Sequence, residues 1–149
     1  MKRIYDWARW IESNLYMGVD VIDSVDHPLV EGGVYDSSAR GMYFRESRRA
    51  WISLIGESQW ERDVLKTLFH ELGHHLIQLG WADEIKLSTP SNFQHLISSS
   101  WIETYPPEEQ MEEILVESFA LWALSLYKQG GGIHPEVKSL LKDIALAIS

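Results

Sequence analysis

The pattern His70-Glu71-Leu72-Gly73-His74 constrains this chain more than any other feature of its sequence. It lies inside a helix-periodic apolar stretch, residues 60–80. Because residues four apart share one face of an α-helix, His70 and His74 can bind one zinc ion together. Glu71 then stands where a carboxylate can take a proton from a metal-activated water. The pattern predicts a helix packed on the core and zinc-dependent hydrolysis of peptide bonds.

The residues around the motif favour a helix with one apolar face. Apolar side chains recur at three- and four-residue spacing, as in a helix packed on a core: Trp60, Val64, Leu65, Leu68, Phe69, Leu72, Leu76 and Leu79. We expect this helix over residues 58–79, with Gly80 as its C-terminal cap. Gly73 lowers helix stability by about 1 kcal/mol relative to alanine, so we expect another segment to approach closely there. His75 lies off the face of the two motif histidines and is interpreted as a polar residue outside the site.

A third metal ligand has to come from a later part of the chain. Catalytic zinc usually has three protein ligands and one open position, and position 80, where a third histidine could follow at short spacing, is glycine. Residues 108–128 predict a second helix, which Pro107 would begin. Within it, Glu113 and Glu117 are like charges four residues apart among apolar neighbours. A nearby cation would resolve that conflict.

We expect these two glutamates to have different roles at one Zn²⁺ per chain. Glu113 is expected to bind the metal. Glu117 is expected to accept a hydrogen bond from the outer ring nitrogen of a ligand histidine, because such carboxylates fix the orientation of the ring. The reverse assignment, with Glu117 as the ligand, stays open at this point, as does a purely solvated acidic face. Glu71 is expected to act as general base and later to protonate the leaving amine.

These residues resemble the gluzincins, metallopeptidases in which a glutamate from a second helix completes the metal site. The resemblance is strongest to the anthrax lethal factor-like family, which includes the small secreted Pro-Pro endopeptidases. Residues 113–119 are similar to that family's second helix: a glutamate, three apolar residues, a second glutamate and an aromatic. Glu113 follows His70 by 43 residues, which suits the family. The resemblance implies a zincin-like fold and a tyrosine before the helix, here Tyr105, that stabilises the oxyanion; His95 is a rival donor.

Other functions stay open on the sequence alone. A second resemblance is to the ImmA/IrrE group, proteases that act on phage-type repressors, and it implies a regulatory protease dedicated to one partner protein. A zinc-binding but inactive interaction module and a toxin effector domain are further alternatives. Glu71 argues against the inactive module, because a scaffold needs no general base. The motif therefore favours an enzyme, while the bond that it cuts is left undetermined.

Composition narrows the range of partners. The chain has 149 residues, which fits a single domain over 1–149, and its net charge of −9 argues against a broad nucleic-acid surface. Cysteine is absent, so disulfides and thiolate ligands are excluded. The first seven residues lack the apolar core of a signal peptide, and no apolar stretch is long enough to span a membrane. We expect a cytoplasmic protein or a secreted mature form, without a membrane partner.

The order of the predicted elements indicates an α+β fold in which a small twisted sheet packs on the two site helices. Around them we expect the following segments: a helix over 4–16, a turn-rich connection over 19–29, strands over 29–35, 41–45 and 50–55, a long connection over 81–106 with a short helix near 92–99, and a last helix over 135–148. A peptide or protein substrate is expected to bind in extended form along an edge strand between 41 and 55.

Two groups of side chains could have either a purely structural or a functional role. Arg45, Arg48 and Arg49 form either a solvated hairpin turn or a rim that favours acidic substrates. Trp81 and Trp101 flank the long connection, and they either line the cleft or pack in the core.

Overall fold

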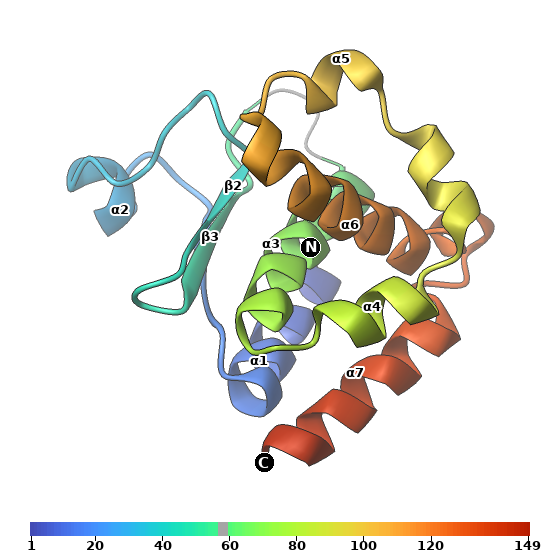
Figure 1. The fold of residues 1–149 in the computed structure, drawn as a ribbon. Helices are drawn as coiled ribbons and strands as arrows, with labels where there is room; N and C mark the ends of the chain where they lie inside the picture. Colours follow the sequence, from blue (N-terminus) through green and yellow to red (C-terminus); the bar gives the residue numbers. More distant parts are fainter. Residues whose placement is uncertain (57–59) are drawn as a thin grey trace.

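The computed structural model describes residues 1–56 and 60–149 and has the α+β architecture expected from the sequence (Figure 1). Its sheet is three-stranded and mixed, in the order β1-β3-β2. The strands are β1 (Gly18–Ile22), β2 (Gly41–Phe44) and β3 (Arg49–Ser53). β1 runs parallel to β3, while β2 pairs antiparallel with it and forms an edge of the sheet.

Helices make up most of the rest of the described chain. They are α1 (Lys2–Leu15), α2 (Pro28–Glu31), α3 (Glu61–Gln78), α4 (Ala82–Ser88), α5 (Ser99–Ile102), α6 (Pro107–Ala123) and α7 (Pro135–Ile148), with 3-10 turns η1 (Ser91–Leu96) and η2 (Tyr127–Gln129). α3 packs against α6 on one side and against β2 and β3 on another (Figure 1). The core joins side chains from α1, β3, α3, α6 and α7.

The motif helix forms for the reason that its apolar periodicity indicates. Leu65, Leu68, Leu72 and Leu76 are fully buried, and Gly80 follows the helix in a left-handed conformation, with φ +96°. The placement of Trp60 on the buried face was wrong. The helix begins at Glu61, so Trp60 precedes its first turn, and 73% of its surface is exposed. The predicted first residue, Ser58, lies outside the described residues.

Two predictions for the segment before the sheet hairpin were wrong. Residues 18–22, all but the first inside the predicted turn-rich connection over 19–29, form strand β1. Val19, Val21 and Ile22 carry a local strand signal that the prediction overlooked, and parallel pairing with β3 stabilises the short run. Residues 29–31, predicted as the start of a strand over 29–35, belong instead to α2, which begins at Pro28. Pro28 occupies the first helical turn, and the Nδ1 atom of His27 accepts a hydrogen bond from the Leu29 N–H.

The remaining predictions agree with the structure apart from their boundaries. The strands over 41–45 and 50–55 correspond to β2 and β3, and the last helix is α7. α6 begins at Pro107 as predicted but ends at Ala123, before the predicted Lys128. The long connection contains α4 and α5 as well as the short helix near residue 92. Within the described residues, no helix combines the length and the apolar character needed to cross a membrane.

Gly73 controls how closely the two site helices approach. A Cβ atom at this position would lie 2.9 Å from the Cβ of Val116 on α6 and 3.3 Å from its Cα. Val116 is fully buried, so a shift of its side chain would disturb the packing around it. The close approach predicted from the glycine is therefore confirmed. It brings the histidine face of α3 against the glutamate face of α6.

Gly73→Ala should lower the free energy of unfolding. Overpacking typically costs about 1–3 kcal/mol, whereas the better helix propensity of alanine contributes only about 1 kcal/mol in the opposite direction. Urea denaturation of the two proteins would measure the difference. Val116→Ala should cost less in the Gly73→Ala background than in the parent chain, because it relieves part of the clash. Additive effects of the two substitutions would contradict this account.

Candidate metal centre

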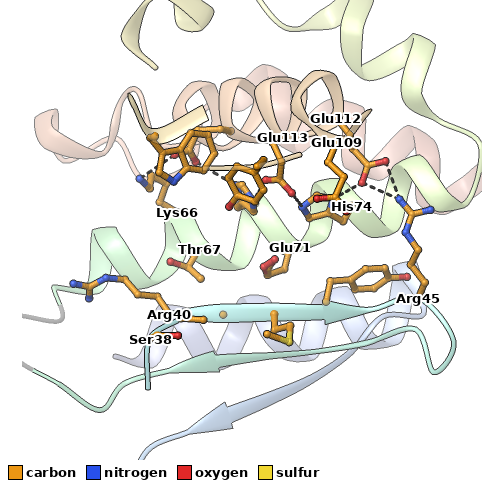
Figure 2. A pocket seen from close by; sticks show the side chains of 18 of the residues that line it. Ser38, Arg40, Arg45, Lys66, Thr67, Glu71, His74, Glu109, Glu112 and Glu113 are labelled. Carbon is orange, nitrogen blue, oxygen red and sulfur yellow. Dashed lines mark hydrogen bonds and ion pairs between the residues drawn. The ribbon is translucent and has the colours of Figure 1, made fainter. Parts of the chain in front are cut away.

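His70, Glu71 and His74 form a group that could hold a metal ion. Their ligand atoms lie within 4.8 Å of one another, and the two imidazole ring centroids are 5.1 Å apart. The one-turn spacing on α3 produces this proximity. In Figure 2, His74 lies on the side of α3 that faces α6, while Glu71 lies between α3 and β2.

The carboxylate of Glu113 faces both histidines. Its Oε2 atom lies 3.0 Å from the Nε2 of His70, and its Oε1 atom lies 3.0 Å from the Nε2 of His74. Glu113 is 8% exposed, so these contacts are largely shielded from water. The structure therefore brings together the three residues that the sequence predicted as metal ligands, with both Nε2 atoms turned toward one carboxylate.

Each outer histidine nitrogen also meets a carboxylate. The Nδ1 of His70 lies 3.2 Å from Glu117 Oε1, as predicted, and the Nδ1 of His74 lies 2.6 Å from Glu112 Oε2. The sequence prediction missed Glu112. A signal was present, because two ligand histidines each need an acceptor behind the ring, and Glu112 directly precedes Glu113.

Each of these two carboxylates, Glu112 and Glu117, also forms an ion pair with a basic side chain. The Nη2 of Arg45 lies 2.9 Å from both oxygens of Glu112, and the Nζ of Lys66 lies 3.4 Å from Glu117 Oε2. The arginines that lie close together in the sequence therefore have different partners in the structure. Arg45 belongs to the site, whereas Arg49 pairs with Asp20 on β1 at 2.9 Å and belongs to the hairpin.

The group opens into a cavity of about 750 Å³. β2 and the loop before it form one wall, α6 forms the opposite wall, and α3 contributes the motif residues (Figure 2). Trp101 and Tyr105, from the connection that leads into α6, also line this cleft. That volume lies within the range of ligand-binding clefts, and His70, Glu71 and His74 are among its lining residues.

Glu71 is a second buried acid of the cleft, with 6% of its surface exposed. Burial raises the pKa of its carboxyl, and the neighbouring Glu113 adds to that effect, while His70 and His74 oppose it. A carboxylate with raised proton affinity inside a cleft is typical of a general base.

The contacts between histidines and carboxylates change their proton affinities in opposite directions. Burial disfavours protonated His70, but hydrogen bonds with Glu113 and Glu117 outweigh burial and raise its pKa to about 10. Burial likewise disfavours ionised Glu113, but hydrogen bonds from the two histidines lower its pKa to about 2. Without a metal, protonated His70 is therefore paired with the ionised carboxylate of Glu113. Metal binding must displace the histidine proton, since histidine binds metals in its neutral form.

The aromatic residues of the connection lie beside the motif. The Trp101 ring is 6.1 Å from that of His70 and 5.1 Å from that of Tyr105. Burial and the nearby Glu113 raise the pKa of the Tyr105 hydroxyl to about 12, so it remains an O–H donor at neutral pH. Tyr105 therefore reaches the predicted cleft, and Trp101 lines it.

Three other residues lie away from the cleft. His95 is exposed on η1, and Trp81 packs against the core. His75, interpreted as a polar residue outside the site, is outside it but fully buried. Its Nε2 donates to the Leu15 carbonyl at 2.7 Å, and its Nδ1 lies 2.8 Å from the Tyr43 hydroxyl.

Comparison with protein-family models, curated proteins and solved structures finds no match to this chain.

The metal-free protein should lose stability at alkaline pH. The His70 pKa is raised from 6.5 to about 10, so its stabilising contribution is complete below pH 6.5 and is lost as pH rises through 10. The Glu113 pKa is lowered from 4.5, so its contribution is present above pH 4.5 and is lost as pH falls toward 2. Urea denaturation with chelator present would measure the alkaline decline. Glu113→Gln should make the decline shallower, and an unchanged slope would contradict the pairing.

Proposed function

We propose that this chain is a zinc-dependent metalloendopeptidase with a zincin-like active site. His70, His74 and Glu113 would hold the metal, and Glu71 would act as the general base. The observation that carries the proposal is the Glu113 carboxylate, which lies 3.0 Å from the Nε2 of each motif histidine. Two imidazoles and one carboxylate are a common ligand set of catalytic zinc.

The chemistry of these donors fits zinc better than calcium or magnesium. Calcium and magnesium prefer oxygen ligands, whereas imidazole nitrogens favour zinc and its transition-metal neighbours. The outer nitrogens face Glu117 and Glu112, as is usual for histidines that bind a metal. The group also borders an open cleft, which distinguishes a catalytic site from a closed structural one.

The residues of the cleft supply the acid–base chemistry. When bound, zinc would lower the pKa of a water molecule and polarise the scissile carbonyl. Glu71 accepts the proton of the attacking water and then donates it to the leaving amine. Burial of Glu71 suits this exchange, because it raises the proton affinity of the carboxylate. Tyr105 donates a hydrogen bond to the carbonyl oxygen as negative charge develops there.

β2 is suited to hold an extended peptide. The Arg40 carbonyl accepts a hydrogen bond from Ser53 N–H at 2.9 Å, so Arg40 directs its backbone polar groups toward β3. Because this orientation alternates along an antiparallel strand, Gly41 and Tyr43 direct theirs toward the free edge, beside the cleft. A substrate strand added there would be held by main-chain hydrogen bonds, whatever its side chains.

Gly41 allows β2 to lie close to the general base. A Cβ atom at position 41 would be 2.5 Å from the Thr67 Cγ2 and 3.5 Å from the Cγ of Glu71. The missing side chain therefore brings the strand edge against α3, next to the acid. This closeness supports a role in hydrolysis, because a module that only binds zinc needs neither a buried carboxylate nor a strand edge beside it.

The two glutamates of α6 should differ in their effect on zinc binding. Glu113→Ala should abolish zinc retention, since it removes a ligand. Glu117→Ala should weaken the affinity by roughly 10- to 100-fold, because it removes only the acceptor behind His70. Elemental analysis of protein purified without added metal, followed by titration with zinc, would measure both effects. The opposite ranking would make Glu117 the ligand.

Glu71→Gln should keep zinc and lose hydrolysis. We expect about one zinc per chain and a fall in kcat of about 100- to 10,000-fold, the usual contribution of a general base. The parent protein would be assayed on a random peptide library, with Glu71→Gln as the matched inactive control. Cleavage of many peptides would indicate a broad endopeptidase. Zinc binding without cleavage of library peptides would overturn a broad endopeptidase and would favour either a protease dedicated to one partner protein or an inactive zinc-binding module.

A further inference from the structure

Glu112 is held from two directions. Its Oε2 lies 2.6 Å from the Nδ1 of His74, and both of its carboxylate oxygens lie 2.9 Å from the Nη2 of Arg45. Glu112 lies on α6, whereas Arg45 directly follows β2. The pair therefore joins the two walls of the cleft at one end, as Figure 2 shows.

Glu112 is poorly placed to hold His74 alone. Its side chain is 26% exposed, and Glu108 and Glu109 precede it by four and three residues on the same helix. Like charges at such spacing repel, and a partly exposed carboxylate gains hydration by turning toward water. Among the residues that the structure describes, Arg45 is the lysine or arginine that forms an ion pair with Glu112. The arginine therefore counters both tendencies.

The carboxylate behind His70 is in a different situation. The Glu117 side chain is only 14% exposed, and Lys66 lies 3.4 Å from it. Burial between α3 and α6 already restricts Glu117, and the cation comes from α3 itself. Glu112 instead depends on a cation from outside the two helices.

Arg45 is itself anchored near the motif. Its main-chain carbonyl accepts a hydrogen bond of 2.9 Å from the Nε2 of Gln78, one turn beyond His74 on α3. The Oε1 of Gln78 in turn accepts a hydrogen bond from the Tyr43 hydroxyl on β2. The backbone that carries the guanidinium is thus attached to the same helix that carries His74.

We propose that Arg45 is a positioning residue of the metal centre, which acts through Glu112 to orient the His74 ring. The inference rests on the proposed function for the presence of the metal, and it adds a link from the substrate-binding strand to a metal ligand. Arg45 follows the strand β2, whose edge would hold a peptide. A displacement of β2 would therefore change the orientation of the His74 ring through the ion pair between Arg45 and Glu112.

Zinc affinity distinguishes positioning from a simple charge effect. Removal of a positive charge near a cation site would strengthen zinc binding by electrostatics alone. Loss of positioning would weaken it, and we expect Arg45→Gln to raise the zinc dissociation constant about tenfold, the lower end of the usual range for such contacts. Competition with a fluorescent chelator would measure the constant. Visible absorption of the Co²⁺-loaded protein gives a second readout, which should change in the variant.

Four further variants complete the test. Glu112→Ala should weaken zinc binding at least as much as Arg45→Gln, and the double variant should match Glu112→Ala, because Arg45 acts through that carboxylate. Arg45→Lys should recover part of the affinity, since it restores the charge without the guanidinium geometry. Arg9→Gln, which breaks an exposed ion pair on α1, should change nothing and serves as the control.

The outcomes separate this inference from the function on which it rests. If the parent protein takes up no zinc, the proposed function fails and the inference fails with it. If the parent binds zinc and Arg45→Gln binds it equally or more tightly, the positioning role alone is overturned. Fully additive losses in the double variant would also overturn it. Thermal unfolding of each metal-free variant would show whether the fold is intact, and Arg45→Lys provides the comparison if Arg45→Gln does not fold.

Discussion

The close packing of α3 on α6 is the constraint on which the rest of the site depends. With glycine at position 73, Val116 lies within 2.9 Å of where a Cβ atom would be, closer than a side chain there would allow. At that separation a single carboxylate, from Glu113, contacts the Nε2 atoms of both His70 and His74. A wider separation would turn the same residues into solvated charges. The helix contact therefore converts two sequence motifs into one group.

Several carboxylates buried close together repel one another unless positive charges lie between them, and in this site Glu112, Glu113 and Glu117 each have such a partner. Each histidine lies between the shared carboxylate of Glu113 and an outer carboxylate, Glu117 or Glu112, and each outer carboxylate has a cation behind it. Alternating charges lower the cost of desolvation that isolated buried groups would carry. The same alternation keeps the rings in one orientation, which is what a metal site of fixed geometry needs.

The sheet places an edge strand, β2, along one side of the cleft. β2 lies at the edge of the sheet, beside the cleft, and the backbone polar groups of Gly41 and Tyr43 face the side away from β3. Trp101 and Tyr105 border the cleft from the connection that precedes α6. A group that can hold a metal, a buried acid and a free strand edge thus share one cavity. This combination is the basis of the proposed hydrolysis of an extended peptide.

Local pattern determined much of this protein. The spacing of His70, Glu71 and His74 within an apolar period predicted α3, and the charge conflict between Glu113 and Glu117 predicted their place in the site. Only the tertiary structure decided what depends on contacts between distant segments. β1 is stabilised by its pairing with β3, and the contacts of Glu112 with His74 on α3 and with Arg45 after β2 depend on how those elements pack. Periodicity reports which face of a helix is buried, whereas the partner of a charge depends on how separate elements pack, which no local pattern records.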